Sequence, residues 1–99
     1  MTFVTTQPEL MTAAANQLQG IGSAVAAQNA AAAAPTLAVV PAAADEVSAL
    51  TAMQFAAHAA LYQEVGAQAA AIHAVFVQIL RASGTSYAGT EAANAIAAG

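Results

Sequence analysis

The sequence predicts an all-α protein, a two-helix antiparallel hairpin that completes a four-helix bundle with a partner hairpin. Alanine, the strongest helix former, makes up about a third of the 99 residues. Apolar residues recur at spacings of three and four along two long segments, which a short proline-bounded stretch separates. The apolar face of the second segment is too wide for one neighbouring helix to cover, and this width predicts the partner hairpin.

The composition bears on both folding and function. Hydrophobic residues are 60% of the chain, charged residues are 6%, and the formal net charge is -4. Arg81 is the single basic residue, so the chain lacks the cations with which nucleic-acid-binding proteins neutralise phosphates. The absence of cysteine excludes disulfide and thiolate chemistry. Because few large side chains are available for a core, a chain of this size is expected to finish folding against a partner.

The first helix is expected over about residues 7–34. Thr6 and Glu9 fit a capping box, with Thr6 as the N-cap residue and Glu9 three residues later as its reciprocal partner. Pro8 falls in the first turn, where its missing N–H costs nothing. An apolar stripe that spans about 80° of a helical wheel follows along this helix. The stripe includes Leu10, Leu18, Ile21 and Val25.

Glycines and prolines mark the weak points of this first helix. Gly20 and Gly22 each weaken it by about 1 kcal/mol relative to alanine, but they allow a neighbouring backbone to approach closely. Pro35 and Pro41 bound the connection to the second helix, which is expected over residues 35–42. This short connection makes the two helices antiparallel neighbours.

The second helix is expected over about residues 43–82. Acidic residues lie in its first turn and Arg81 lies in its last turn, the arrangement that complements the helix dipole. Residues 1–82 would then form the helical hairpin. Residues 83–99 begin with a Ser-Gly-Thr-Ser run and are expected to form a flexible tail.

The apolar face of the second helix is its main feature. This face covers about 200° of the helical wheel, whereas an amphipathic helix packed on one neighbour needs little more than about 100°. We therefore expect the same residues to serve both the hairpin core and an interface with a partner. The residues assigned to this face are Leu50, Phe55, Leu61, Val65, Ile72, Phe76 and Leu80.

The chain offers no candidate metal or cofactor site. His58 and His73 are fifteen residues apart on one helix, which separates them by about 22 Å, too far to share an ion. His58 and Gln54 fall within the apolar face, where they are expected to form hydrogen bonds that set the register across an interface.

Membrane insertion and Sec-type export are not expected either. The N-terminal sequence has no positively charged region and no long apolar core, so it does not fit a cleavable signal peptide. Prolines and polar residues interrupt every long apolar window, so no transmembrane segment is expected.

Five short motifs occur in order along the chain. Phe3-Val4 and Pro8-Glu9 lie near the N-terminus, Ala-Gln-Asn-Ala occupies positions 27–30, a Val-Pro-Ala-Ala-Ala-Asp-Glu-Val-Ser run begins at Val40, and Tyr87-Ala-Gly-Thr-Glu91 lies near the C-terminus. Taken together over essentially all 99 residues, they resemble the mycobacterial PE family. The chain looks like a short PE protein that consists of the PE domain alone.

The resemblance implies a specific biology. PE proteins are helical hairpins that pair with PPE-family proteins, and a type VII (ESX-type) system exports the folded pair to the outside or the cell surface. In this family a Tyr-x-x-x-Asp/Glu motif is the export signal, which Tyr87 and Glu91 match. An EspG-type chaperone holds the PPE subunit before export and reaches the PE subunit only indirectly. The motifs resemble those of members exported by an ESX-five-type system. Roles at the cell envelope and the host interface follow from the same resemblance, which implies no enzyme activity.

Two other functions compete with this interpretation. A self-associating helical hairpin at the outer envelope would also explain the low charge and the wide apolar face. A small esterase would need Ser86 as nucleophile, but the surrounding Gly-Thr-Ser-Tyr-Ala is one residue short of the required motif and lacks the preceding strand.

Overall fold

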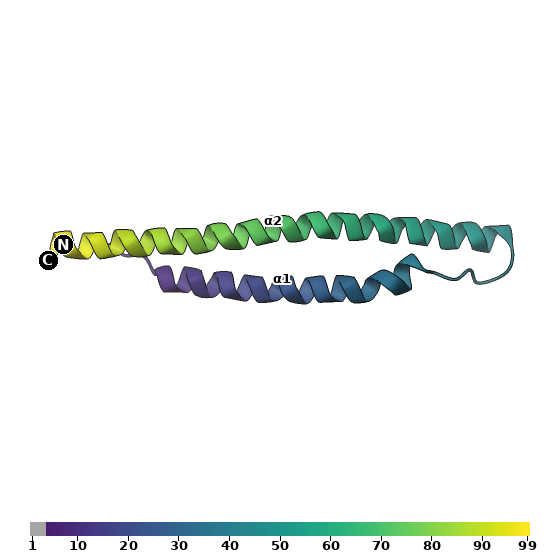
Figure 1. The fold of residues 1–99 in the computed structure, drawn as a ribbon, viewed down its shortest axis with the longest axis horizontal. Coiled ribbons are helices and arrows are strands. Elements are labelled where there is room, and N and C mark those ends of the chain that lie inside the picture. Colours follow the sequence, from purple (N-terminus) through teal and green to yellow (C-terminus); the bar gives the residue numbers. More distant parts are fainter. Residues whose placement is uncertain (1–3) are drawn as a thin grey trace. The chain divides into compact units, whose positions relative to one another are not determined.

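The computed structural model describes residues 4–99, which form two helices joined by a loop (Figure 1). Helix α1 spans Pro8–Leu37 and helix α2 spans Glu46–Ala98, and no strand occurs within the described range. The all-helical class and the two-helix hairpin are therefore confirmed. The four-helix bundle with a partner hairpin stays a prediction.

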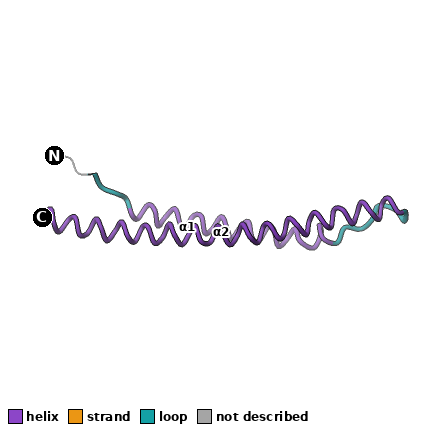
Figure 2. The backbone as a smooth tube through the Cα atoms, turned by 90° about the horizontal axis from the view of Figure 1, so that it is seen from above, coloured by secondary structure: helices purple, strands orange, loops and turns teal. Residues whose placement is uncertain are grey.

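The chain forms two compact units, and each unit takes a part of both helices. Within each unit the two helical parts run antiparallel and side by side (Figure 2). The line of contact between α1 and α2 within a unit is called the seam below. Unit 1 comprises Met1–Gly22 and His73–Gly99, and unit 2 comprises Ser23–Ile72.

Helix α1 begins one residue later than a Thr6 cap requires. The carbonyl of Gln7 accepts the N–H of Met11 at 3.4 Å, so Gln7 is the N-cap residue and Pro8 is the first helical residue. The expected capping box is wrong, because Glu9 then stands one position too early to reach back to the cap. Within the described range no hydrogen bond joins Thr6 to Glu9, and the Thr6 hydroxyl instead reaches α2.

Helix α1 also ends later than expected, at Leu37 rather than before Pro35. Proline cannot donate a backbone hydrogen bond, so the last turn needs other donors. The Thr36 hydroxyl donates to the carbonyl four residues earlier at 2.6 Å, and the Ala38 N–H donates to the Ala34 carbonyl at 3.1 Å. These two bonds lie in the last turn, and neither goes to the Ala31 carbonyl, which is the one that loses its helical donor at Pro35.

Asp45 starts helix α2 as its N-cap residue. Its carboxylate accepts the Ser48 N–H at 2.8 Å and the Ser48 hydroxyl at 3.1 Å, while its carbonyl accepts the Ala49 N–H at 3.0 Å. A cap that satisfies the third helical N–H fixes where the helix begins. The helix therefore starts at Glu46 and not at the expected residue 43.

Helix α2 continues to Ala98, so the expected boundary at residue 82 is not found. The segment that was expected as a tail is rich in alanine, which outweighs the cost of its isolated glycines. The hydroxyls of Thr85 and Thr90 bond to the carbonyls four residues earlier at 3.2 and 3.1 Å, so they follow the helix instead of breaking it.

Small residues line the seam. In unit 1, Ala15 is fully buried, Val77 is 4% exposed, and Gly84 is buried where a Cβ would meet the Thr12 hydroxyl at 3.0 Å. In unit 2 the buried residues on α2 are Ala52 and Ala59. The helices therefore pack closely through alanine and glycine, with little large apolar volume between them.

The large apolar residues expected in the hairpin core lie mostly outside it. Leu18 and Leu80 are half-buried, but the others are between 52% and 71% exposed. The prediction that these exposed residues form the core of the hairpin is therefore wrong, because the small residues of the seam leave no room for large side chains. We call this exposed set the apolar face: Leu10, Ile21, Val25, Leu50, Phe55, Leu61, Val65, Ile72 and Phe76.

Candidate functional site

The apolar face has a defined position beside the seam. In unit 1, Ile21 immediately precedes Gly22, and Phe76 immediately precedes Val77. One residue along a helix is a rotation of about 100°, so both side chains are turned away from the seam in the same sense. In an antiparallel pair the same sense of rotation places both on the same side. Unit 1 thus presents one apolar surface to which both helices contribute.

Unit 2 repeats this arrangement on α2. Val65 immediately precedes Gly66, which lies against Asn29, so Val65 is turned about 100° from the seam. Leu61 and Ile72 share the face of Val65 by helical spacing and are 61% and 71% exposed. All three side chains of this surface are more than half exposed.

Polar contacts fix the register of the seam in unit 1. Nε2 of His73 donates to the Leu18 carbonyl at 2.6 Å, since a carbonyl can only accept. The guanidinium of Arg81 donates to the side-chain oxygen of Asn16 at 2.8 Å and also to that of Gln19. The single cation of the chain is therefore engaged by amide oxygens within this unit.

Asn29 is the centre of the polar contacts in unit 2. Its Oδ1 accepts the Tyr62 hydroxyl at 2.8 Å, and its carbonyl accepts an N–H of Gln63 at 2.9 Å. His58 and Gln54, which were expected to set a register, are exposed in this unit. Their hydrogen bonds across an interface with a partner stay a prediction.

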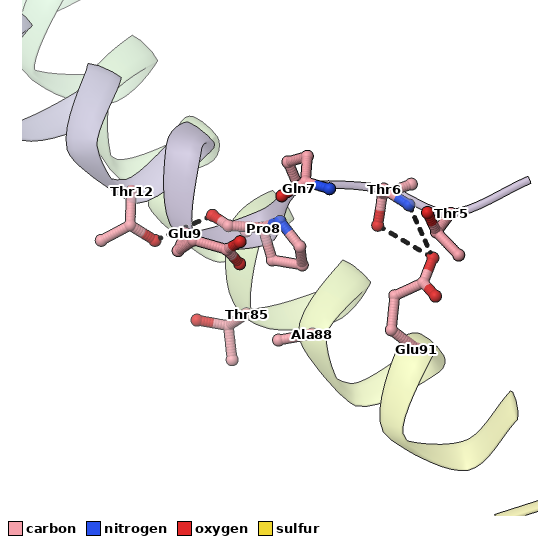
Figure 3. A pocket seen from close by; sticks show the side chains of 10 residues that line it. Thr5, Thr6, Gln7, Pro8, Glu9, Thr12, Thr85, Ala88 and Glu91 are labelled. Atoms are coloured by element: carbon pink, nitrogen blue, oxygen red, sulfur yellow. Dashed lines mark hydrogen bonds between the residues drawn. The ribbon is translucent and has the colours of Figure 1, made fainter. Parts of the chain in front are cut away.

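The Tyr-x-x-x-Glu motif lies on the last turns of α2. Tyr87 and Glu91 are four residues apart and so are neighbours on the helix surface. Tyr87 is 46% exposed, whereas Glu91 is half-buried and already has partners. Oε1 of Glu91 accepts the backbone N–H of Thr6 at 2.9 Å and the Thr6 hydroxyl at 3.0 Å (Figure 3). No local sequence signal predicts this contact, because 85 positions separate the two residues.

A shallow pocket lies where the N-terminal segment meets the end of α2 in unit 1. Two carboxylates, Glu9 and Glu91, belong to its lining (Figure 3). Within residues 4–99, no group of three or more His, Cys, Asp or Glu side chains comes close enough to hold a metal ion. The full lining is Thr5, Thr6, Gln7, Pro8, Glu9, Thr12, Gly84, Thr85, Ala88 and Glu91.

Two further features of α2 bear on the sequence expectations. Ser86 lies inside the continuous helix, whereas a nucleophile elbow places its serine between a strand and a helix. Helix α2 is also long and apolar enough, by length and composition alone, to cross a membrane. The expectation of no transmembrane segment relied on the polar residues that interrupt the apolar runs, and the mean hydropathy of this helix is high in spite of them.

Comparison with known proteins assigns the family. The PE family model matches residues 4–94. PE family protein PE13 of Mycobacterium tuberculosis is 64% identical over 98 residues, which cover 99% of both chains. PE8 of the same organism is 56% identical, but the chain spans only 36% of it, and PE_PGRS33 is 54% identical, with the chain spanning about a fifth. None of these names states an enzymatic activity. With the match over nearly its whole length, the chain belongs to the PE family.

Proposed function

We propose that this chain is the PE half of a heterodimer with a PPE-family protein, and that a type VII secretion system of the ESX-five type exports the pair. Its role is non-catalytic and lies outside the cell or at the cell surface, at the envelope or the host interface. Tyr87 and Glu91 carry the export signal, and an EspG-type chaperone acts on the pair through the PPE subunit.

The observation that carries this proposal is the exposed apolar face beside a seam of small residues. Within residues 4–99 four apolar residues are buried, three of them alanine, and they give the hairpin a thin core of its own. Covering one large apolar side chain that is about 60% exposed contributes roughly 1–2 kcal/mol. The nine residues of the face thus offer on the order of 10 kcal/mol to a partner, before the entropic cost of association.

The chemistry of the face also defines the partner. It is apolar, uncharged and presented by both helices of unit 1, so it fits the apolar stripe of another helical hairpin. The chain has a single cation, and amide oxygens engage it, which leaves little basis for an anionic partner. A PPE-family hairpin is the partner to which family membership points.

Co-expression tests the heterodimer. The chain is produced together with a candidate PPE-family protein, either unchanged, as Phe76→Asp on the apolar face, or as Gln78→Asp. Both positions are exposed in unit 1, so neither substitution disturbs the seam. We expect Phe76→Asp to abolish co-purification and Gln78→Asp to retain it. Equal recovery of the PPE protein with both variants would refute the face as the interface.

Secretion tests the signal. Tyr87→Ala removes a ring that is 46% exposed and leaves the buried residues of the seam unchanged. We expect the heterodimer to form normally in the cell while the secreted fraction is lost. Unchanged secretion of Tyr87→Ala would remove this motif from the export signal.

Self-association is the second candidate, because the same exposed face could pair with another copy. Light scattering of the purified chain over a range of concentrations distinguishes the two functions. A defined homodimer that PPE protein fails to displace would favour self-association at the outer envelope. The esterase alternative would be supported only if the chain hydrolysed an ester probe and the Ser86→Ala variant did not.

A further inference from the structure

We propose that Glu91 acts in the Tyr87–Glu91 motif as a positioning residue: its carboxylate holds residues 4–7 against α2, so that Thr6 belongs to the surface that the export machinery contacts. This inference rests on the proposed role of the motif as an export signal. It adds to that role a second segment, far away in the sequence, and a division of tasks between the two motif residues.

The position of Glu91 on α2 supports this assignment. Val77, Gly84 and Glu91 follow one another at intervals of seven residues, which keeps them on one side of a helix in a two-helix pair. Val77 and Gly84 are buried in the seam. A Cβ added at Gly84 would lie 3.3 Å from the carbonyl oxygen of Pro8, so α2 passes close to the first turn of α1 at this point. Glu91 is the next residue of this series, beyond the first turn of α1. It therefore faces the segment that precedes α1.

The segment before α1 supplies two donors to one oxygen. The backbone N–H and the hydroxyl of Thr6 both bond to Oε1 of Glu91, at 2.9 and 3.0 Å (Figure 3). Thr6 precedes the cap residue Gln7, so its N–H has no role in the hydrogen-bond pattern of α1. Within the described residues, these two are the hydrogen bonds by which residues 4–7 reach α2, so Glu91 is what holds the segment there.

Tyr87 and Glu91 therefore differ in what they offer a receptor. The Tyr87 ring is 46% exposed, and a rotation of about 40° separates it from Glu91 on the helix. The carboxylate of Glu91 is half-buried and directed toward the N-terminal segment. A receptor that approaches the ring meets residues 4–7 beside it. The negative charge mainly strengthens the internal bonds, because bonds to a charged acceptor exceed neutral ones.

The test uses variants of Thr6 in the full chain, co-produced with its PPE partner. Thr6→Val removes the hydroxyl donor with little change of shape, and Thr6→Ser keeps both donors. Thr5→Val is the matched control, because Thr5 lines the same pocket without bonding to Glu91. Two quantities are measured: the secreted fraction, and deuterium uptake by the N-terminal peptide of the purified complex.

We expect Thr6→Val to speed exchange in the N-terminal peptide and to lower secretion, each about threefold, which corresponds to the loss of one hydrogen bond. Thr6→Ser and Thr5→Val should behave like the unchanged chain. Glu91→Gln should reproduce Thr6→Val, and the double variant should be no worse than Glu91→Gln alone.

Three results would overturn the proposal. Normal secretion of Thr6→Val beside impaired secretion of Glu91→Gln would show that the receptor contacts the carboxylate directly. Increased secretion of Thr6→Val would show that the segment masks the motif. Unchanged exchange in both variants would show that Glu91 does not hold the segment. Failure of the export signal itself appears separately, as normal secretion of Tyr87→Ala.

Discussion

Replacing Gly22 by alanine tests the close packing of the seam in unit 1. A Cβ added at Gly22 would lie 2.7 Å from Cδ2 and 2.8 Å from Nε2 of His73, distances that real Cβ atoms do not show. The imidazole must therefore move, and its bond to the Leu18 carbonyl at 2.6 Å must break or lengthen. Gly20→Ala is a built-in control on the same helix, because a Cβ there meets nothing within 4 Å.

The expected magnitudes have opposite signs. Both substitutions gain about 1 kcal/mol of helix propensity. Gly22→Ala also loses roughly 0.5–1.5 kcal/mol for the His73 hydrogen bond and about 1–3 kcal/mol for the forced repacking. We therefore expect Gly20→Ala to stabilise the protein by about 1 kcal/mol and Gly22→Ala to destabilise it by roughly 2 kcal/mol.

Thermal unfolding followed by far-UV circular dichroism, on the same preparation for each variant, measures both effects. For a domain of this size, about 1 kcal/mol corresponds to a shift in Tm of roughly 4–8 °C. Gly22→Ala combined with His73→Ala should recover part of the loss, because the clash has been removed. If Gly22→Ala raises Tm as much as Gly20→Ala does, the helices do not approach at Gly22 and the seam described here is wrong.

The remaining predictions concern single hydrogen bonds. Asp45→Ala should lower the free energy of unfolding by about 1 kcal/mol, because the Ser48 N–H loses its cap. Thermal melts measure this loss against Ser48→Ala, which removes the hydroxyl bond to Asp45 but keeps the backbone bond. Tyr62→Phe should cost about 0.5 kcal/mol in urea unfolding, since an exposed bond to Asn29 is lost. An effect above 2 kcal/mol would mean that the Tyr62 hydroxyl is buried in solution.

The sequence predicted the fold class because helix propensity and helical spacing are local properties. It failed at the helix ends, where single hydrogen bonds decide: Gln7 caps α1 where Thr6 was expected, and Asp45 caps α2 so that the helix begins at Glu46. The Tyr87–Glu91 motif could be found from its spacing alone. The Thr6 contact could not, because it depends on how the two helices are aligned along the seam.

The misplaced hairpin core has a more general cause. The large apolar residues follow helical periodicity on the exposed face, whereas the seam follows a seven-residue repeat of mostly small and polar residues. Such a repeat brings two backbones close together and leaves the large side chains to one side. It thereby separates the residues that hold the hairpin from those that remain for a second hairpin, so substitutions in the seam should change stability before they change partner binding. The repeat is not exposed over two stretches and ends where Thr36 and Tyr87, the next positions, are exposed; the unexposed positions are Pro8, Ala15, Gly22 and Asn29 on α1, and Ala52, Ala59, Gly66, His73 and Leu80 on α2.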